Sequence, residues 1–319
     1  MTWRHTQRWP TIYSGALCAI LFLLSTRANA DIYYVIVAGL GGEPDYEQRF
    51  NAEAKDLDKI LKNSSNRAHS FMLVGMDASS SRLKDTLTTV AHTAKPEDDF
   101  VLILIGHGSF DGTTYKFNLP GPDISAEDIA EICNHIPPRR QLIVNTSSAS
   151  GGAIPALRHP GRAIVTATKS GTEKNATIFA RYWVEALQDP SADTDKSGSI
   201  SALEAFTYAT KKTASFYESQ KRLATEHAVF TDSATGEPAR GPTEGQGALM
   251  SNLILLRLDE APNVSNDPAK RTLLEKKEEL EQKIDTLKYQ KAAMEPAEYK
   301  KQLTAMLLEL ARVQQEIDK

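Results

Sequence analysis

Apolar, β-branched stretches alternate with amphipathic stretches along the first two thirds of the chain. Continuous apolar runs predict five strands, at residues 32–38, 71–74, 100–105, 142–144 and 163–167. Apolar residues at helical spacing predict helices over 46–61, 82–94, 125–136 and 175–187. This alternation is typical of an α/β fold, a three-layer sandwich in which a mostly parallel sheet carries helices on both faces.

The pattern changes in the last third of the chain. Residues 231–246 are rich in Gly, Pro, Ser and Thr and predict a loop, and the apolar run at 248–258 can add a strand. Within 268–319, apolar residues repeat every seven positions on both sides of Pro296. We expect a C-terminal α-helical hairpin or coiled-coil tail, which buries its apolar stripe within itself or against a protein partner.

The first thirty residues have the pattern of a signal peptide. Arg4 and Arg8 precede an apolar run at 12–24, and small residues at 28–30 form a cleavage site. The run is short for a membrane span, so we expect a secreted or periplasmic protein that does not span the membrane after cleavage; an uncleaved anchor is the alternative. The folded domain is expected over residues 31–260.

Composition and cysteine usage narrow the function classes. The 319 residues carry a net charge of -4, so no basic excess points to nucleic acid. If the signal peptide is removed, Cys133 is the one cysteine left, and no internal disulfide can form. Because Cys133 lies in a helical pattern, we expect a buried small apolar residue rather than a nucleophile.

Polar residues follow two of the predicted strands directly. Gly106, His107 and Gly108 follow the run at 100–105, and residues 145–152, which include Ser147 and Ser148, follow the run at 142–144. The carboxyl ends of parallel strands meet at one edge of a sheet, where functional residues of such folds lie. A histidine and a serine at this edge are the layout of a general base and a nucleophile.

The order of these two blocks resembles the clan of caspases, gingipains and legumains, and it is closest to legumain-like proteins. The resemblance covers about residues 32–187 and implies a caspase-like sheet. It implies that His107 assists proton transfer and that the backbone amides of Gly108 and of the nucleophile form an oxyanion hole. Ser147 falls where the family has cysteine, and Asn145 matches the acid or amide two positions earlier; Ser148 takes the nucleophile role if the loop is shifted by one residue.

Serine in place of cysteine leaves two hypotheses for this site. An alcohol is far less acidic than a thiol and needs a closely bonded, oriented base. We therefore expect a catalytically degenerate, peptidase-like protein that binds a peptide or protein ligand. The alternative is an active endopeptidase or other hydrolase that uses His107 and Ser147, with an acid at Glu43, Asp45 or Asp111 to orient the histidine.

Residues 193–204 match the EF-hand calcium loop at its key positions. The expected Ca²⁺ ligands are Asp193, Asp195, Ser197, the carbonyl of Ser199, and Glu204. Gly198 permits the sharp turn, and Ser201 can act through water. Because no second loop of this quality is present, a structural ion is expected rather than a calcium sensor. A third hypothesis follows, a calcium-stabilised interaction protein whose C-terminal helices bind a partner.

Overall fold

The structure is a computed structural model that describes residues 30–65, 67–243, 245–258, 268–289, 291 and 294–317. The expected signal peptide, except for Ala30, lies outside these described residues. Within them, no helix combines the length and the apolar character that a membrane crossing needs.

A six-stranded sheet forms the centre of the domain. Its order is β10-β8-β7-β3-β1-β2, and every neighbouring pair is parallel except β10 with β8. The strands are β1 (Ile32–Ala38), β2 (Ala68–Leu73), β3 (Asp99–Ile105), β7 (Arg140–Asn145), β8 (Arg162–Thr166) and β10 (Val229–Thr231). All five expected strands are present, and the antiparallel edge strand β10 was not expected.

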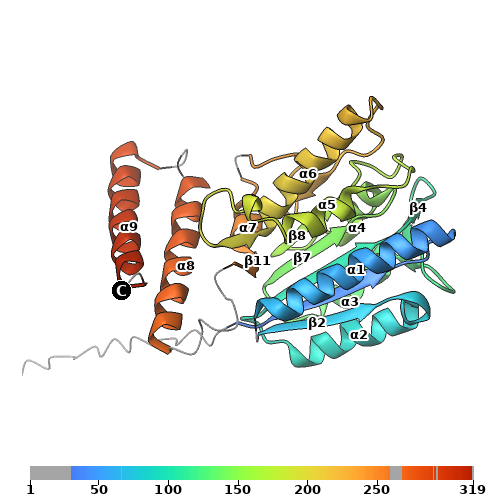
Figure 1. Cartoon of the computed structure of the whole chain (residues 1–319), viewed down its shortest axis with the longest axis horizontal. Helices are drawn as coiled ribbons and strands as arrows, with labels where there is room; N and C mark the ends of the chain where they lie inside the picture. The colour runs from blue at the N-terminus through green and yellow to red at the C-terminus, as the bar shows by residue number, and fades with distance from the viewer. Residues whose placement is uncertain are drawn as a thin grey trace, which may run out of the picture.

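Helices cover both faces of this sheet, which confirms the three-layer α/β expectation (Figure 1). One buried cluster joins the sheet to α1 (Pro44–Ser64), α5 (Phe179–Ala186) and α6 (Ala202–Ser219). A second cluster joins the opposite face to α2 (Ser80–Thr93), α3 (Ala126–Asn134) and α4 (Ile154–Leu157). The helix expected at 175–187 begins later, at Phe179, where the side chain of Glu226 accepts the Ile178 and Phe179 backbone N–H groups.

Local sequence signals explain several boundaries. Ser125 caps α3, because its Oγ accepts the backbone N–H of Asp128 at 3.0 Å. Cys133 lies on the buried face of α3, and burial raises the pKa of its thiol to about 12, which favours the packing role over a nucleophilic one.

The polar region after β3 forms a small antiparallel sheet of β4 (Gly108–Phe110), β5 (Tyr115–Phe117) and β6 (Ile124–Ser125). Short 3₁₀ turns lie at Gly75–Asp77, Ser150–Ala153 and Pro190–Ala192.

The C-terminal part forms the expected α-helical hairpin. Helices α8 (Pro268–Tyr289) and α9 (Pro296–Ile317) lie side by side, and Lys276 on α8 forms a 2.9 Å ion pair with Glu309 on α9 (Figure 1). The helix α7 (Ala248–Asn252) contacts α8, and Asn252 Nδ2 donates to Thr286 Oγ1 at 3.3 Å. The hairpin therefore packs on the domain at the end opposite to β4.

The apolar run at 248–258 divides into α7 and the strand β11 (Ile254–Arg257). This strand pairs antiparallel with β9 (Ser199–Ser201), which lies inside the expected calcium loop. The run thus adds a strand, although to a separate two-stranded sheet and not to the central one.

Candidate functional site

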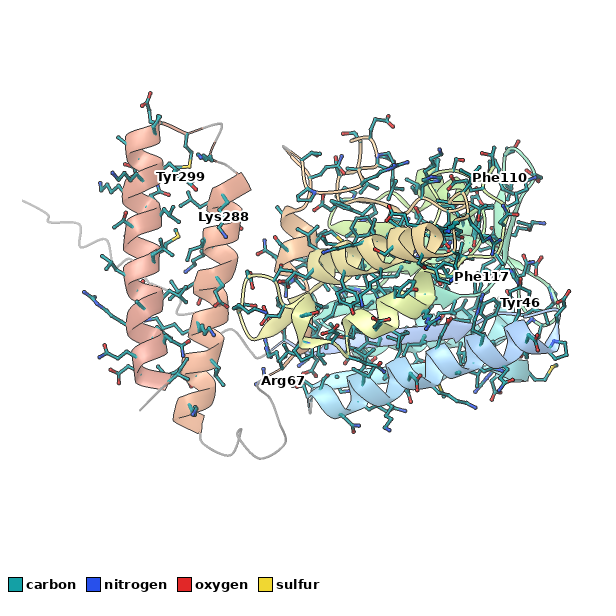
Figure 2. All side chains as sticks on the ribbon, turned by 45° about the horizontal axis from the view of Figure 1, so that its top comes forward. Tyr46, Arg67, Phe110, Phe117, Lys288 and Tyr299 are labelled. Carbon is teal, nitrogen blue, oxygen red and sulfur yellow. The ribbon has the colours of Figure 1, made fainter. Side chains whose placement is uncertain are left out.

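The loops that follow β1, β3 and β7 meet at one edge of the central sheet. These three strands are neighbours and run parallel, so their carboxyl ends lie about 4.8 Å apart from strand to strand. Figure 2 shows Tyr46, Phe110 and Phe117 at this end of the molecule, far from Tyr299 on the hairpin. The structure therefore brings the expected His107 and serine blocks to one edge.

Ser148 contacts the backbone that follows His107. The Gly108 N–H donates to Ser148 Oγ at 3.1 Å, and the Ser148 hydroxyl donates to the Gly108 carbonyl, also at 3.1 Å. A Cβ atom on Gly108 would lie 2.6 Å from the Ser148 carbonyl oxygen and 2.5 Å from Tyr115 Oη, so this approach requires glycine. The Ser148 hydroxyl therefore both accepts a hydrogen bond from the Gly108 backbone and donates one to it.

Ser147 faces a different, fully buried environment. Its Oγ lies 2.6 Å from Tyr115 Oη and donates to Asn145 Oδ1 at 2.8 Å. The sequence favoured Ser147 as the nucleophile position; in the structure Ser148, and not Ser147, is hydrogen-bonded to the Gly108 backbone. Strand β7 extends to Asn145, one residue beyond the apolar run that predicted it, so the serine beside Gly108 comes one residue later.

His107 is half-buried against the first turns of α1. Its ring makes edge-on contacts with Tyr46 and Phe50, with ring centroids 4.8 Å and 5.1 Å away. The guanidinium of Arg49 lies over the same two aromatic rings, 5.0 Å and 5.1 Å from their centroids. Burial lowers the pKa of His107, and the positive charge of Arg49 lowers it further, so the neutral imidazole is favoured.

No carboxylate is hydrogen-bonded to this imidazole in the described parts of the chain. The backbone of Gly41, in the loop after β1, favours the charged form of the ring and so opposes the lowering of its pKa. Of the three acids expected as orienting partners, Asp111 accepts the N–H groups of Thr113 and Thr114 in its own turn. Glu43 and Asp45 are exposed, and no hydrogen bond joins either of them to His107 in the described parts of the chain.

Neither serine is bonded to the histidine. Across the described residues, no hydrogen bond joins the His107 ring to Ser147 or Ser148. His107 and Ser148 lie on neighbouring strand ends, yet they lack the bond that activates a serine nucleophile. The arrangement presents a neutral histidine, a cationic Arg49 and a glycine backbone at one surface.

The turn that holds Ser148 depends on residues that the sequence reasoning did not identify. Ala149 has a left-handed backbone with φ of 56°, and its N–H donates to the Glu173 carbonyl at 2.8 Å. The Glu173 carboxylate in turn binds both the ring and the backbone N–H of His227. These residues are 54 positions apart, so no local motif could have revealed the pair.

The expected calcium loop brings its acidic residues together. Ligand oxygens of Asp193, Asp195 and Glu204 all lie within 4.8 Å of one another. Ser197 Oγ lies 3.3 Å from the Ser199 carbonyl oxygen, so the remaining two expected ligands are also adjacent. Gly198, at the position of the sharp turn, has a φ of 83°. This oxygen-rich set of donors fits Ca²⁺, a hard cation that prefers such ligands.

The loop is bounded by one long helix and one short turn. Glu204 also belongs to a capping box at the start of α6, where its Oε2 accepts the N–H of Ser201 at 3.0 Å. On the incoming side, α5 ends at Ala186, and a 3₁₀ turn at Pro190–Ala192 replaces the helix of a complete helix-loop-helix unit. Pro190 accounts for this break, because proline lacks the backbone N–H that a continuing helix needs.

No protein-family model and no curated protein sequence matches this chain. Among solved structures, the chain is similar to protein GSU0716 from Geobacter sulfurreducens at 10% identity and a TM-score of 0.47, over 72% of this chain and 100% of that one. It is similar to the Drosophila initiator caspase Dronc at 12% identity and a TM-score of 0.42, over 75% and 94% of the two chains.

A third similarity involves a much larger protein. Raptor from Chaetomium thermophilum matches at 13% identity and a TM-score of 0.36, over 51% of this chain and 19% of that one. At such low identities and TM-scores, these similarities assign neither a family nor an activity to this chain.

Proposed function

We propose that this chain is a secreted or periplasmic protein with a peptidase-like fold that binds a peptide or protein segment at the His107 edge without cleaving it. The sequence resemblance to the caspase and legumain clan motivates the choice of ligand. A Ca²⁺ ion held by residues 193–204 stabilises the domain. In this proposal Ser148, and not Ser147, occupies the position of the family's nucleophile.

One observation supports the proposal that the protein does not cleave its ligand. The Ser148 hydroxyl donates its proton to the Gly108 carbonyl and accepts the Gly108 N–H, each at 3.1 Å. An oxyanion hole needs that N–H to be aimed at the substrate, and a nucleophile needs its proton aimed at a base. The Gly108 N–H and the Ser148 proton are both used in the Ser148–Gly108 hydrogen bonds. The residues of this edge are therefore suited to binding a ligand rather than to cleaving it.

The neutral His107 favours a second candidate function, that of an active serine hydrolase. A neutral imidazole carries one N–H and retains a lone pair on its other ring nitrogen. If Ser148 rotated away from Gly108, that nitrogen could take its proton while Oγ attacked a carbonyl carbon. The Gly108 N–H would then be free for the oxyanion.

Labelling with a fluorophosphonate separates the two candidates, because the probe forms a covalent bond only with an activated serine. The binding proposal expects no labelling of the calcium-loaded wild type beyond that of the Ser148→Ala variant. Labelling of the wild type that is lost in both Ser148→Ala and His107→Ala would support the hydrolase. Ser147→Ala is the matched control, since Ser147 is buried against Tyr115.

A further inference from the structure

The hairpin carries an open, mostly apolar groove beside the connection between α8 and α9. The groove has a volume of about 380 Å³, and its apolar lining comes from Pro296, Tyr299, Leu303 and Leu307. Leu307 is 47% exposed, whereas Val313 on the same helix is buried against α8. The packing of α9 against α8 therefore leaves part of the apolar surface of α9 exposed.

Two lysines border the groove, and no carboxylate is among its described lining residues. Lys291 and Lys300 line it, with the Lys291 ammonium 5.7 Å from the ring centroid of Tyr299. Neither lysine forms an ion pair with a described carboxylate, in contrast to Lys276, which pairs with Glu309. Apolar lining next to two uncompensated cations complements a ligand that carries an apolar side chain beside a carboxylate.

We propose that this groove binds an amphipathic helical segment of a partner protein, with an apolar anchor residue that enters the groove and an Asp or Glu within one turn of it. A groove of about 380 Å³ fits a few side chains, in the manner of helix-in-groove recognition. A flat anionic membrane fits less well, because the apolar lining lies within a groove, which a side chain can enter and a flat bilayer surface cannot follow. The hairpin lies at the far end of the molecule from the His107 edge, so this surface acts independently of the proposed site (Figure 2).

Matched neighbours on α9 make the proposal testable. Leu307 lines the groove, and Leu308, which is 58% exposed, does not. Lys300 lines it, and the exposed Lys301 does not. Because all four side chains are exposed, their substitution to Glu leaves the α8–α9 packing in place, which circular dichroism verifies.

The experiment is a selection from a displayed random-peptide library with the full chain as bait, with removal of peptides that also bind the Leu307→Glu variant. The expected peptides pair Leu, Phe or Met with Asp or Glu within one helical turn. Their affinity, measured on synthetic copies, should fall roughly tenfold or more in Leu307→Glu and Lys300→Glu and stay within about twofold in Leu308→Glu and Lys301→Glu.

Several outcomes would overturn the proposal. Failure to enrich any peptide, enrichment of basic peptides, or an equal loss of affinity in the Leu308→Glu or Lys301→Glu controls would each do so. Binding to phosphatidylglycerol vesicles that Lys300→Glu abolishes, in the absence of peptide binding, would assign the surface to a membrane. Self-association of the wild type that Leu307→Glu abolishes would assign it to a second copy of the chain.

Discussion

The backbone N–H of Leu258 donates to the carbonyl of Gly198 at 2.8 Å, so the segment that leads to the C-terminal hairpin is bonded to the expected calcium loop, residues 193–204. The pairing of β11 with β9 and the bond from the Ala202 N–H to the Leu253 carbonyl extend this connection. An ion held by residues 193–204 would therefore stabilise β11 as well as the loop.

Calcium should raise the thermal stability of the protein. Binding to the folded state alone adds about 2.7 kcal/mol at a Ca²⁺ concentration near a hundred times Kd. The measurement is the melting temperature with Ca²⁺ and with a chelator. Glu204→Gln should reduce the difference, because it removes one ligand charge while glutamine keeps the capping bond to Ser201.

Glu218→Gln is the control for this prediction, since Glu218 is exposed on the same helix α6 and lies outside the loop. It should leave the effect of calcium unchanged. A wild type that melts at the same temperature with and without Ca²⁺ would contradict a calcium site in this loop.

Removal of residues 268–319 should leave a folded domain. Among the described side chains, the two main buried clusters of the sheet contain none from α8 or α9, and those buried within the hairpin are Leu280, Ile284, Leu287 and Val313. We expect a cooperative transition at a slightly lower temperature. The melting temperature should fall by roughly 2–4 °C for each kcal/mol of stability that is lost with the α7–α8 contact. Loss of the cooperative transition in circular dichroism would show that the hairpin belongs to the core.

Cysteine substitution should distinguish the two serines. Ser148→Cys places a thiol next to the Gly108 N–H and near neutral His107, whereas Ser147→Cys places it in the buried contact with Tyr115. We expect iodoacetamide to modify the Ser148→Cys variant about tenfold faster or more. Cys133 should stay unmodified in both, because burial raises its pKa to about 12. Faster modification of the Ser147→Cys variant would favour Ser147 as the nucleophile position.

The fold could be predicted from the sequence because its strands and helices are strongly patterned. The runs at β1 and β3 are continuous and apolar, and the structure buries both strands on both faces. Strand β10 escaped prediction because its three residues, Val229–Thr231, gain their strand conformation from pairing with β8 and not from a local pattern.

The site was less predictable, since its details depend on single backbone bonds. The histidine at the end of β3 followed from the motif, but the identity of the adjacent serine depended on one additional residue of β7. The His107 ring packs against Tyr46 and Phe50 of α1, and no motif around the histidine marks these contacts between distant segments. The Glu173–His227 pair could not be predicted because its two residues are 54 positions apart in the sequence.

The ionisation of His107 should depend on Arg49. Arg49→Met removes a positive charge and should raise the pKa of His107, as measured by the NMR titration of its ring protons. Lys55→Met, at an exposed position of the same helix, is the control and should leave that pKa unchanged. An unchanged titration in Arg49→Met would show that burial alone lowers the pKa.

The same lowered pKa sets a pH dependence of stability. The unfolded chain binds this proton near pH 6.5, before the folded protein does. The histidine therefore lowers the free energy of unfolding as the pH falls below about 6.5 and has no such effect at higher pH. In urea titrations, the free energy of unfolding of His107→Gln should therefore fall less steeply below about pH 6.5 than that of the wild type.

The central claim, that the His107 edge binds without cleaving, is tested most directly by incubating the calcium-loaded wild type with a diverse peptide library and identifying products by mass spectrometry. The Ser148–Gly108 hydrogen bonds predict that the wild type releases no more product than Ser148→Ala or His107→Ala. Cleavage by the wild type that both variants lose would contradict the claim and establish a working serine hydrolase.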